Sequence, residues 1–206
     1  NTTVTTAANH TLYAHWHLTP ANAPYNVKLT MNPTTGVYGE RIYHRVSSSS
    51  NTDHTTETTW FACDENGDNG TLLTDENGKP TYPTTLTAGV HYYYVLVTAT
   101  RKANGLQAST KSNVVCVTVT KATPKITEPP PAAKLDLAKG NTLAYSALTG
   151  GVAKNTNIRT GSNVVAGRFV WKDADFKPPR GGKRYAVVFY PDDTQNYELT
   201  ETTVYV

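Results

Sequence analysis

The chain has little of the material from which helical and membrane proteins are built. Its 206 residues include one Met and four Phe, and only 17% of them are charged. Hydrophobic residues never recur with a sustained 3.6-residue period, which argues against amphipathic helices. No stretch reaches the roughly 18 apolar residues that a membrane-spanning helix requires, and no signal peptide is recognisable. Because the chain begins at Asn1 rather than Met, we interpret it as a piece excised from a longer protein.

Patterns that carry catalysis or nucleic-acid binding are also missing. All six histidines lie between His10 and His91, and the serines at 47–50 lack the Gly-x-Ser-x-Gly setting of a nucleophile. Paired carboxylates are neighbours within turns, as in solvated loops. The net charge of +3 is small and evenly spread, without a basic run interleaved with aromatics. We therefore expect neither an enzyme nor a nucleic-acid-binding protein.

What recurs along the chain is a series of short alternating segments bounded by Gly, Pro, Asn and Asp, which predicts an all-β fold. A length of 206 residues suits two domains of roughly 100 residues each. In residues 19–121, which we call module 1, an immunoglobulin-like sandwich with Trp60 buried against the opposite sheet is expected. Its expected strands are Tyr25–Met31, Ile42–Val46, Thr58–Cys63, Thr71–Thr74, Pro83–Thr87, His91–Thr100 and Asn113–Thr120.

A break in the pattern separates module 1 from residues 122–206, which we call module 2. At Lys121 the sequence changes to KATPKITEPPP, and its three consecutive prolines favour a short, stiff link. In module 2 we expect a strand that ends at Pro191, a last strand that begins at Thr200, and a core centred on Phe169, Trp171 and Phe189. Before module 1, the segment TLYAHWH predicts one further strand with its partners upstream.

Three segments resemble repeats of Gram-positive surface proteins. LYAHW at residues 12–16 is similar to the closing strand of the internalin-type B-repeat, so residues 1–18 are interpreted as the tail of a truncated repeat. Residues 19–121 resemble a bacterial immunoglobulin-like module. Residues 122–206 resemble an immunoglobulin-like surface repeat that reads roughly ATP…LSGG…VAGTFxW…FTPxDTxNY, and here the corresponding motifs are ATP, LTGG, VAGRFVW and AVVFYPDDTQNY. Arg168 stands where that repeat usually has Thr or Ser.

These resemblances imply two tandem immunoglobulin-like β-sandwiches plus an N-terminal remnant strand. They also imply a non-catalytic extracellular segment of a cell-wall-anchored bacterial protein, acting as a structural spacer or adhesin stalk. The expected partners are neighbouring repeats of the same polypeptide, and the segment is expected to be a monomer without membrane insertion. The alternative is a module that binds a glycan or a host protein through loops or exposed aromatics, with Tyr13, Trp16 and the run Tyr92–Tyr94 as candidate platforms.

No cofactor is expected, and DENGDNG at residues 64–70 is the strongest metal candidate. Asp64, Asn66 and Asp68 stand at positions 1, 3 and 5, as in calcium loops. The glycine required at position 6 is displaced to Gly70, and position 12 is Asp75 rather than Glu. Asn-Gly is also a favoured hairpin turn because it tolerates positive φ. We favour the turn over the calcium site.

The two cysteines are predicted to be free thiols. Trp60 points inward, so Cys63, an odd number of residues later, points outward. Cys116 points outward as well, because Val115 and its alternate neighbours form the inward set. The strands that carry the two cysteines are expected to flank the sixth strand, which separates them by about 9–10 Å, whereas a disulfide needs Cα atoms within about 7 Å. A bulge at Asp64 would shift Cys63 and permit a disulfide.

Two weaker interpretations concern other reactive residues. His15 and His17 share a strand face and could form half of a zinc site, but no third ligand is visible and exposed histidines are the simpler interpretation. Lys28 on the first strand and Asn113 at the start of the last could form a Lys–Asn isopeptide bond of the kind found in surface modules. Because the neighbours of Lys28 are apolar, however, Lys28 is expected to face water.

Overall fold

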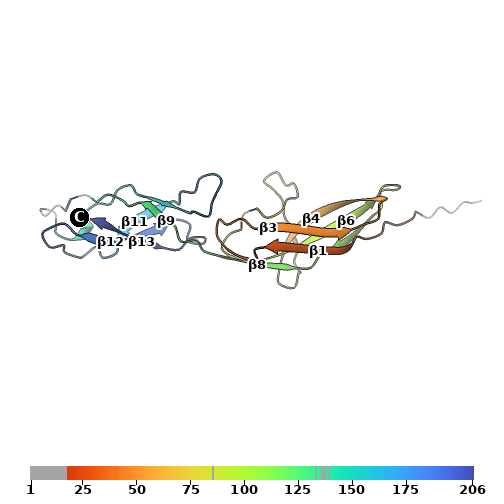
Figure 1. Cartoon of the computed structure of the whole chain (residues 1–206), viewed down its shortest axis with the longest axis horizontal. Coiled ribbons are helices and arrows are strands. Elements are labelled where there is room, and N and C mark those ends of the chain that lie inside the picture. Colours follow the sequence, from red (N-terminus) through yellow and green to blue (C-terminus); the bar gives the residue numbers. More distant parts are fainter. Residues whose placement is uncertain (1–17, 85, 133, 136–137, 139) are drawn as a thin grey trace, which may run out of the picture.

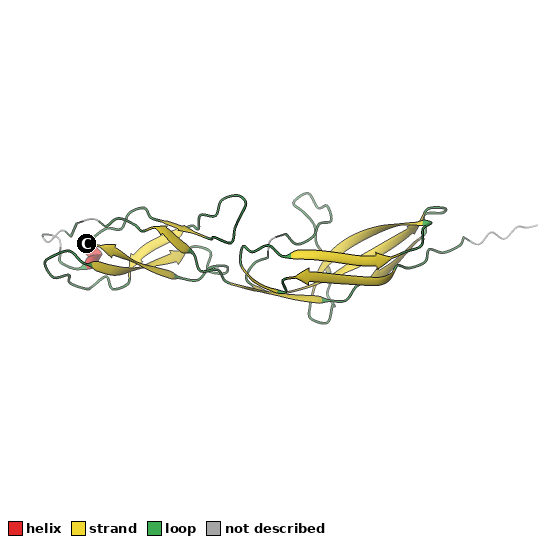
Figure 2. Ribbon diagram, viewed as in Figure 1, coloured by secondary structure: helices red, strands yellow, loops and turns green. Residues whose placement is uncertain are grey.

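A computed structural model describes residues 18–84, 86–132, 134, 135, 138 and 140–206. The expected strand at residues 11–17, with His15, His17 and both aromatics of that segment, lies outside the described residues. Among the described residues the fold is all-β, with strands numbered β1 to β13 and a single 3₁₀ turn, η1 (Leu143–Tyr145). The strands form two bodies that lie end to end along an extended molecule (Figures 1 and 2).

Module 1 is a sandwich of two sheets. One sheet pairs only two antiparallel strands, and the other is six-stranded with its long sixth strand in the centre. The small sheet consists of β1 (Tyr25–Asn32) and β3 (Tyr43–Ser49). The large sheet has the order β2 (Thr35–Val37), β8 (Val115–Thr120), β6 (Gly89–Arg101), β4 (His54–Cys63) and β5 (Thr71–Leu72), and β7 (Gln107–Lys111) also pairs with β6.

The core of module 1 follows the period-two pattern. Val95 and Val97 on β6 are completely buried, as is Val117 on β8, and Trp60 on β4 is 5% exposed. Because side chains alternate along a strand, these residues meet Leu29 and Met31 of the opposite sheet in one continuous cluster. The predicted core of Trp60 with the inward set on the last strand is therefore confirmed.

Some of the expected strands of module 1 were wrong or missed. The described residues of 83–87 are not in a strand, although Leu86 is buried in the core; the nearby prolines, Pro80 and Pro83, lack the amide hydrogens that a strand donates. β7 was missed because its residues are polar and half of it faces solvent. β2 is absent from the expected strands, yet it pairs in parallel with β8.

Module 2 is smaller and is built from shorter strands. β9 (Lys125–Glu128) pairs with β10 (Val152–Lys154), and the second sheet has the order β11 (Gly167–Trp171), β12 (Arg184–Pro191) and β13 (Thr200–Tyr205). Its interior is divided into two clusters, one around Trp171 and one around Phe189, and Phe169 packs against both. The predicted core residues are thus inside, but they do not form a single cluster.

The three consecutive prolines do not lie in the link between the modules. They follow β9, Pro130 is fully buried, and the carbonyl of Pro131 accepts a hydrogen bond from the amide of Thr149 at 3.3 Å. They are therefore part of module 2, and the interpretation of a proline link was wrong. In the described residues, no helix is long and apolar enough to cross a membrane.

Candidate functional site: the joint between the modules

The chain passes from module 1 to module 2 across a single residue, Lys121. Thr120 is the last residue of β8 and still pairs with β2 of module 1. Ala122 already forms a parallel bridge with Tyr197 of module 2, through its amide to the carbonyl of Asn196 and its carbonyl to the amide of Glu198, both at 2.9 Å. So short a link, hydrogen-bonded on both sides, leaves little freedom between the two bodies.

The motif DDTQNY at residues 192–197 forms one half of the joint. The carboxylate of Asp193 accepts hydrogen bonds from the backbone amide of Asn196 at 3.1 Å and from its side-chain Nδ2 at 2.7 Å. Asn196 is thereby held with its Oδ1 free to accept the amide of Ala88 in module 1 at 2.8 Å. Asn196 is only 6% exposed, so this contact between the modules is shielded from water.

The second half of the joint is a loop of module 2 that contacts Tyr38, the residue after β2. Asn155, which is 1% exposed, donates its Nδ2 to the carbonyl of Tyr38 at 2.9 Å. Its Oδ1 accepts the amide of Asn157 at 2.9 Å, which holds the amide group in that orientation. The ring of Tyr38 meets the ring of Tyr197 edge to face, with centroids 5.2 Å apart.

The close approach of the two modules requires a glycine at position 39. Gly39 has φ of +93°, a conformation that side chains rarely adopt. A Cβ there would lie 2.7 Å from Nδ2 of Asn155 and 2.9 Å from Cγ1 of Ile158. The contact also affects Tyr38, because burial, reinforced by the neighbouring Tyr197 and Asp193, raises the pKa of its hydroxyl above the ordinary value.

The arrangement at the joint can fix two bodies relative to each other. Two buried amide side chains supply directional hydrogen bonds and a tyrosine pair supplies apolar contact, all three across the boundary. Buried hydrogen bonds are costly to leave unmade, so they favour one relative orientation of the modules. In the sequence, DDTQNY stands out only through its resemblance to a surface repeat, and no contact with module 1 was predicted for it. No local signal in the sequence marks Asn196 as a residue that becomes buried between the modules.

The calcium candidate, DENGDNG, forms a turn in which the Asp64 carboxylate is hydrogen-bonded within the loop. Oδ1 of Asp64 accepts the amides of Asn66 at 3.1 Å and Asp68 at 2.8 Å, and Oδ2 accepts the side chain of Asn69 at 2.8 Å. These bonds hold the pKa of the Asp64 carboxyl below its usual value. Asp75 accepts the amides of Asn77 and Lys79 in the same way, so DENG occurs twice as the same turn.

The DENGDNG loop packs on the outer face of the large sheet. Lys111 donates its Nζ to the carbonyl of Gly67 and lies over the ring of Tyr94, 4.1 Å from its centroid. A Cβ at Gly67 would lie 2.6 Å from Val114, and one at Gly70 would collide with the hydroxyl of Tyr94. The glycines of this loop therefore serve close packing. Within the described residues, no group of three or more His, Cys, Asp or Glu could hold a metal ion.

The two cysteines are free, and the structure gives the reason that the strand geometry predicted. Cys63 on β4 and Cys116 on β8 are both paired with Tyr92 on the intervening β6. They are thus separated by a whole strand, which is about two spacings of 4.8 Å. Burial raises the pKa of the Cys63 thiol above its ordinary value.

The expected isopeptide pair is not brought together. Asn113 uses its side chain to extend the pairing of β1, with Oδ1 accepting the amide of Leu29 at 2.9 Å and Nδ2 donating to its carbonyl at 3.1 Å. Lys28 is exposed and points away from that core residue. The expectation that Lys28 faces water, which was preferred to the isopeptide pair, is confirmed.

The run Tyr92–Tyr94 does not form a continuous aromatic platform. Tyr93 points into the core and is 5% exposed, and its burial raises its pKa to about 12. Tyr92 and Tyr94 lie on the opposite, outer face of the sheet and are half-buried, with Tyr94 stacked on Phe61 at 5.0 Å. The run, a candidate platform only in the alternative function, is divided by alternation between the two faces of the sheet.

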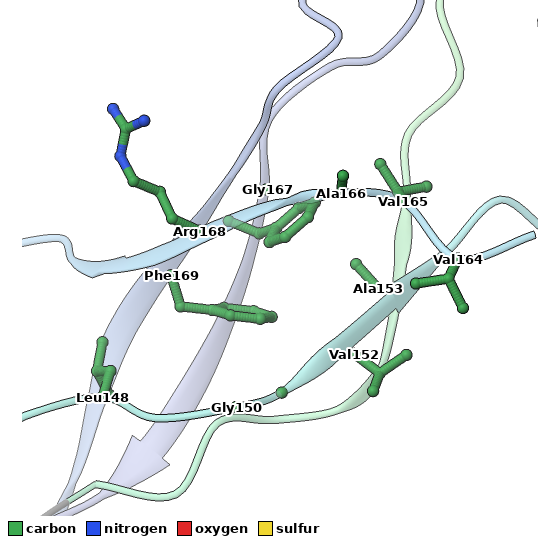
Figure 3. Close-up of a pocket in the computed structure, with 12 residues that line it drawn as sticks. Leu148, Gly150, Val152, Ala153, Val164, Val165, Ala166, Gly167, Arg168 and Phe169 are labelled. Atoms are coloured by element: carbon green, nitrogen blue, oxygen red, sulfur yellow. The ribbon is translucent and has the colours of Figure 1, made fainter.

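In module 2 the motifs LTGG and VAGRF meet around one hollow of about 320 Å³. Figure 3 shows Phe169 reaching into this space between Gly150 and Gly167, while Arg168 points away from it. A Cβ at Gly151 would lie 2.6 Å from the Phe169 ring, and one at Gly167 would collide with the carbonyl of Tyr190. Apart from Arg168 at its edge, the side chains that line the hollow are apolar and none is titratable, so these motifs serve packing.

Comparison of the chain with protein-family models finds no match, and neither does comparison with curated proteins.

Proposed function

We propose that the chain is a non-catalytic extracellular segment of a bacterial cell-surface protein, and that it acts as a rigid spacer in a stalk. The observation that carries this proposal is the joint, in which Asn155 and Asn196 bind the backbone of the preceding module across a one-residue link. A spacer needs modules that keep their direction, because flexible joints shorten the mean reach of a chain.

The resemblance of module 2 to surface repeats suggests that the same joint recurs between neighbouring repeats. The DDTQNY motif, which is part of that resemblance, is here the element that docks on module 1. If neighbouring copies dock in the same way, each repeat carries its own means of alignment to the repeat before it. The partners of the segment are then the adjacent repeats of the same polypeptide, and the molecule is a monomer with respect to other chains.

The experiment that tests the spacer is small-angle X-ray scattering on the full chain and on joint variants. The isosteric substitution Asn155→Asp removes the Nδ2 donor and places an anion against the carbonyl of Tyr38, and Tyr197→Ala removes the edge-to-face pair. We expect the native chain to scatter as a rigid rod, and the double variant to show a shorter maximum dimension and the broad distance distribution of two bodies on a hinge.

Asn141→Asp, at an exposed position away from the joint, is the matched control and leaves the scattering profile unchanged. The double variant should keep the hydrogen-exchange protection of the module 1 core and of the Trp171 cluster. Any loss of protection should be confined to the Phe189 cluster, against which Tyr197 packs. A native chain that already scatters as a hinged pair contradicts the proposal.

Location is tested separately from rigidity. Antibodies against the chain should label intact, unpermeabilised cells that express the parent protein, and brief treatment of such cells with a protease should remove the label. Labelling that requires permeabilisation contradicts the extracellular part of the proposal and leaves the rigid joint untouched.

A further inference from the structure

The small sheet of module 1 presents a polar face to solvent. Leu29 and Met31 on β1 point into the core, so the alternate residues Lys28 and Thr30 point outward. Directly paired residues share a face, and Thr30 is paired with Arg45 on β3. Asn32 is paired in the same way with Tyr43, which is 63% exposed.

The cations on this face are not neutralised by the protein. Lys28 and Arg45 are exposed, and neither takes part in a hydrogen bond or an ion pair recorded for the described residues. Neither β1 (YNVKLTMN) nor β3 (YHRVSSS) contains a carboxylate. The face therefore carries two cations and no carboxylate, and it is available to an anion.

The positive face leads directly into a cleft at the joint. This cleft of about 890 Å³ is lined by Arg41 and Tyr43 of module 1 and by Arg159 of module 2. The one carboxylate in its wall, Glu40, accepts the amide of Val37 through Oε2 at 2.8 Å. Like Lys28 and Arg45, both arginines are exposed.

We propose that this basic stripe, made of Lys28, Arg45, Arg41 and Arg159 with Tyr43 among them, binds an acidic polysaccharide along β3 and into the cleft. Guanidinium groups form paired hydrogen bonds with the carboxylate or sulfate groups that such a polymer carries. The exposed Tyr43 ring provides the flat, amphipathic surface on which a sugar ring packs. Tyr205, which is 62% exposed, lies in module 2 outside this stripe and has one paired cation, Arg184, rather than a row of cations that leads into a cleft.

The spacing of the charges favours a polysaccharide over a nucleic acid. Arg41 lies just before β3 and Arg45 within it, and four residues span at most about 14 Å even when fully extended. Duplex DNA presents one phosphate for about every 1.7 Å of its axis and is bound by denser clusters of cations. A polymer whose anionic groups are separated by whole sugar rings matches sparse cations with an aromatic between them. This role goes beyond the spacer and does not depend on it.

The test is the binding of the full chain to immobilised heparin, hyaluronan and neutral dextran, measured by biolayer interferometry at two salt concentrations. We expect binding to heparin, to hyaluronan or to both, weakening as salt increases, and none to dextran. Preference for heparin identifies sulfate, and equal or tighter binding to hyaluronan identifies carboxylate, as the recognised group. If the chain binds neither heparin nor hyaluronan, the proposal is overturned.

Matched variants separate the stripe from the general charge of the protein. Arg41→Glu with Arg45→Glu should weaken binding at least tenfold, whereas Lys177→Glu with Arg180→Glu, an equal charge change on exposed residues of module 2, should alter it less than twofold. Equal losses overturn the assignment of the site.

The aromatic contribution and the class of polymer are tested in the same assay. Tyr43→Ala should weaken binding at least threefold without a change of charge, and Tyr205→Ala should leave it unaltered. A Tyr43→Ala variant that binds as tightly as the native chain removes the sugar-stacking part of the proposal. Duplex DNA that binds as tightly as the polysaccharides, with the same loss in the arginine double variant, overturns the assignment of a polysaccharide.

Discussion

The two modules reach a similar architecture by different means. Module 1 has a 13-residue central strand and a single core in which Val95, Val97 and Val117 are completely buried. Module 2 has no strand longer than eight residues among its described elements, and its interior is divided around Trp171 and Phe189. Module 1 therefore depends on the amount of apolar surface that alternating strands bury, whereas module 2 depends on a few specific contacts.

The largest effect that would distinguish them is expected from the two buried tryptophans. Replacing a buried Trp by Ala costs about 3–5 kcal/mol. Trp171 also donates its Nε1 to the carbonyl of Ser146 at 2.7 Å, which adds about 1 kcal/mol. We expect Trp171→Ala to unfold module 2. Trp60→Ala should lower the stability of module 1 without unfolding it, because Trp60 belongs to a larger core cluster. Hydrogen exchange resolved by peptide measures both, and loss of protection in module 1 upon Trp171→Ala contradicts the separation of the cores.

A smaller effect is expected from two adjacent glycines of module 2. Gly150 and Gly151 both have positive φ, but only Gly151 is enclosed, since its Cβ would lie 2.6 Å from Phe169 and 3.0 Å from the nitrogen of Pro130. We expect Gly151→Ala to cost about 2–3 kcal/mol through overpacking and strain, and Gly150→Ala only about 1 kcal/mol. Urea denaturation of module 2 measures the difference, and equal costs would show that packing at this motif is loose.

In module 1 the corresponding specific contact is Asn113, which binds the amide and the carbonyl of Leu29. Asn113→Ala should cost about 1–3 kcal/mol, because it leaves two backbone groups of β1 without these partners. Urea denaturation should show the loss in module 1 alone. The intact mass of the native chain, measured by mass spectrometry, should equal the mass calculated from the sequence. A mass lower by one ammonia would show that Asn113 is cross-linked.

The smallest effect is a response to pH that only module 1 should show. Burial against Trp60 and Tyr82 lowers the pKa of His44 below its ordinary value of 6.5. The unfolded chain therefore binds a proton before the folded chain does, so the contribution of His44 to stability is present above pH 6.5 and is lost as the pH falls toward the folded pKa.

Urea denaturation at pH 7 and pH 5.5 measures this response. Module 1 should lose stability in this window, while module 2, which contains no histidine, should change little. His44→Phe keeps an aromatic ring beside Trp60 and removes the titrating group. It should therefore reduce the change in the free energy of unfolding of module 1 between pH 7 and pH 5.5. If the pH dependence of the stability of module 1 is the same in the variant, a group other than His44 causes it.

Much of the fold could be predicted because period-two burial is a local property. Trp60, Val117 and Phe189 reach the interior, as the alternation of their strands predicts. The positions of Cys63 and Cys116 on either side of β6 followed from the same alternation together with the strand order of a sandwich. β7 escaped prediction because a polar edge strand is stabilised by its partner rather than by its own burial.

The candidate sites were less predictable because each depends on groups far apart in the sequence. The sequence at Asp64 favours a turn over a calcium ligand, but only the three hydrogen-bond donors to its carboxylate show the turn itself. Asn155 and Asn196 look like ordinary loop residues, although they contact Tyr38 and Ala88, more than 100 residues away. Nothing local distinguishes an Asn that meets water from an Asn that meets a neighbouring module.

The sequence by itself determined that the described chain is built of strands, that it divides near residue 122, and that Trp60, Trp171 and Phe189 lie in the cores, because alternation and turn residues act within a few positions. The tertiary structure alone decided that the prolines at 129–131 belong to module 2, that DDTQNY joins the modules, and that Arg41, Tyr43 and Arg159 share one cleft. These features arise where two folded surfaces meet, and the shape of such surfaces is set by packing over the whole chain rather than by any short segment.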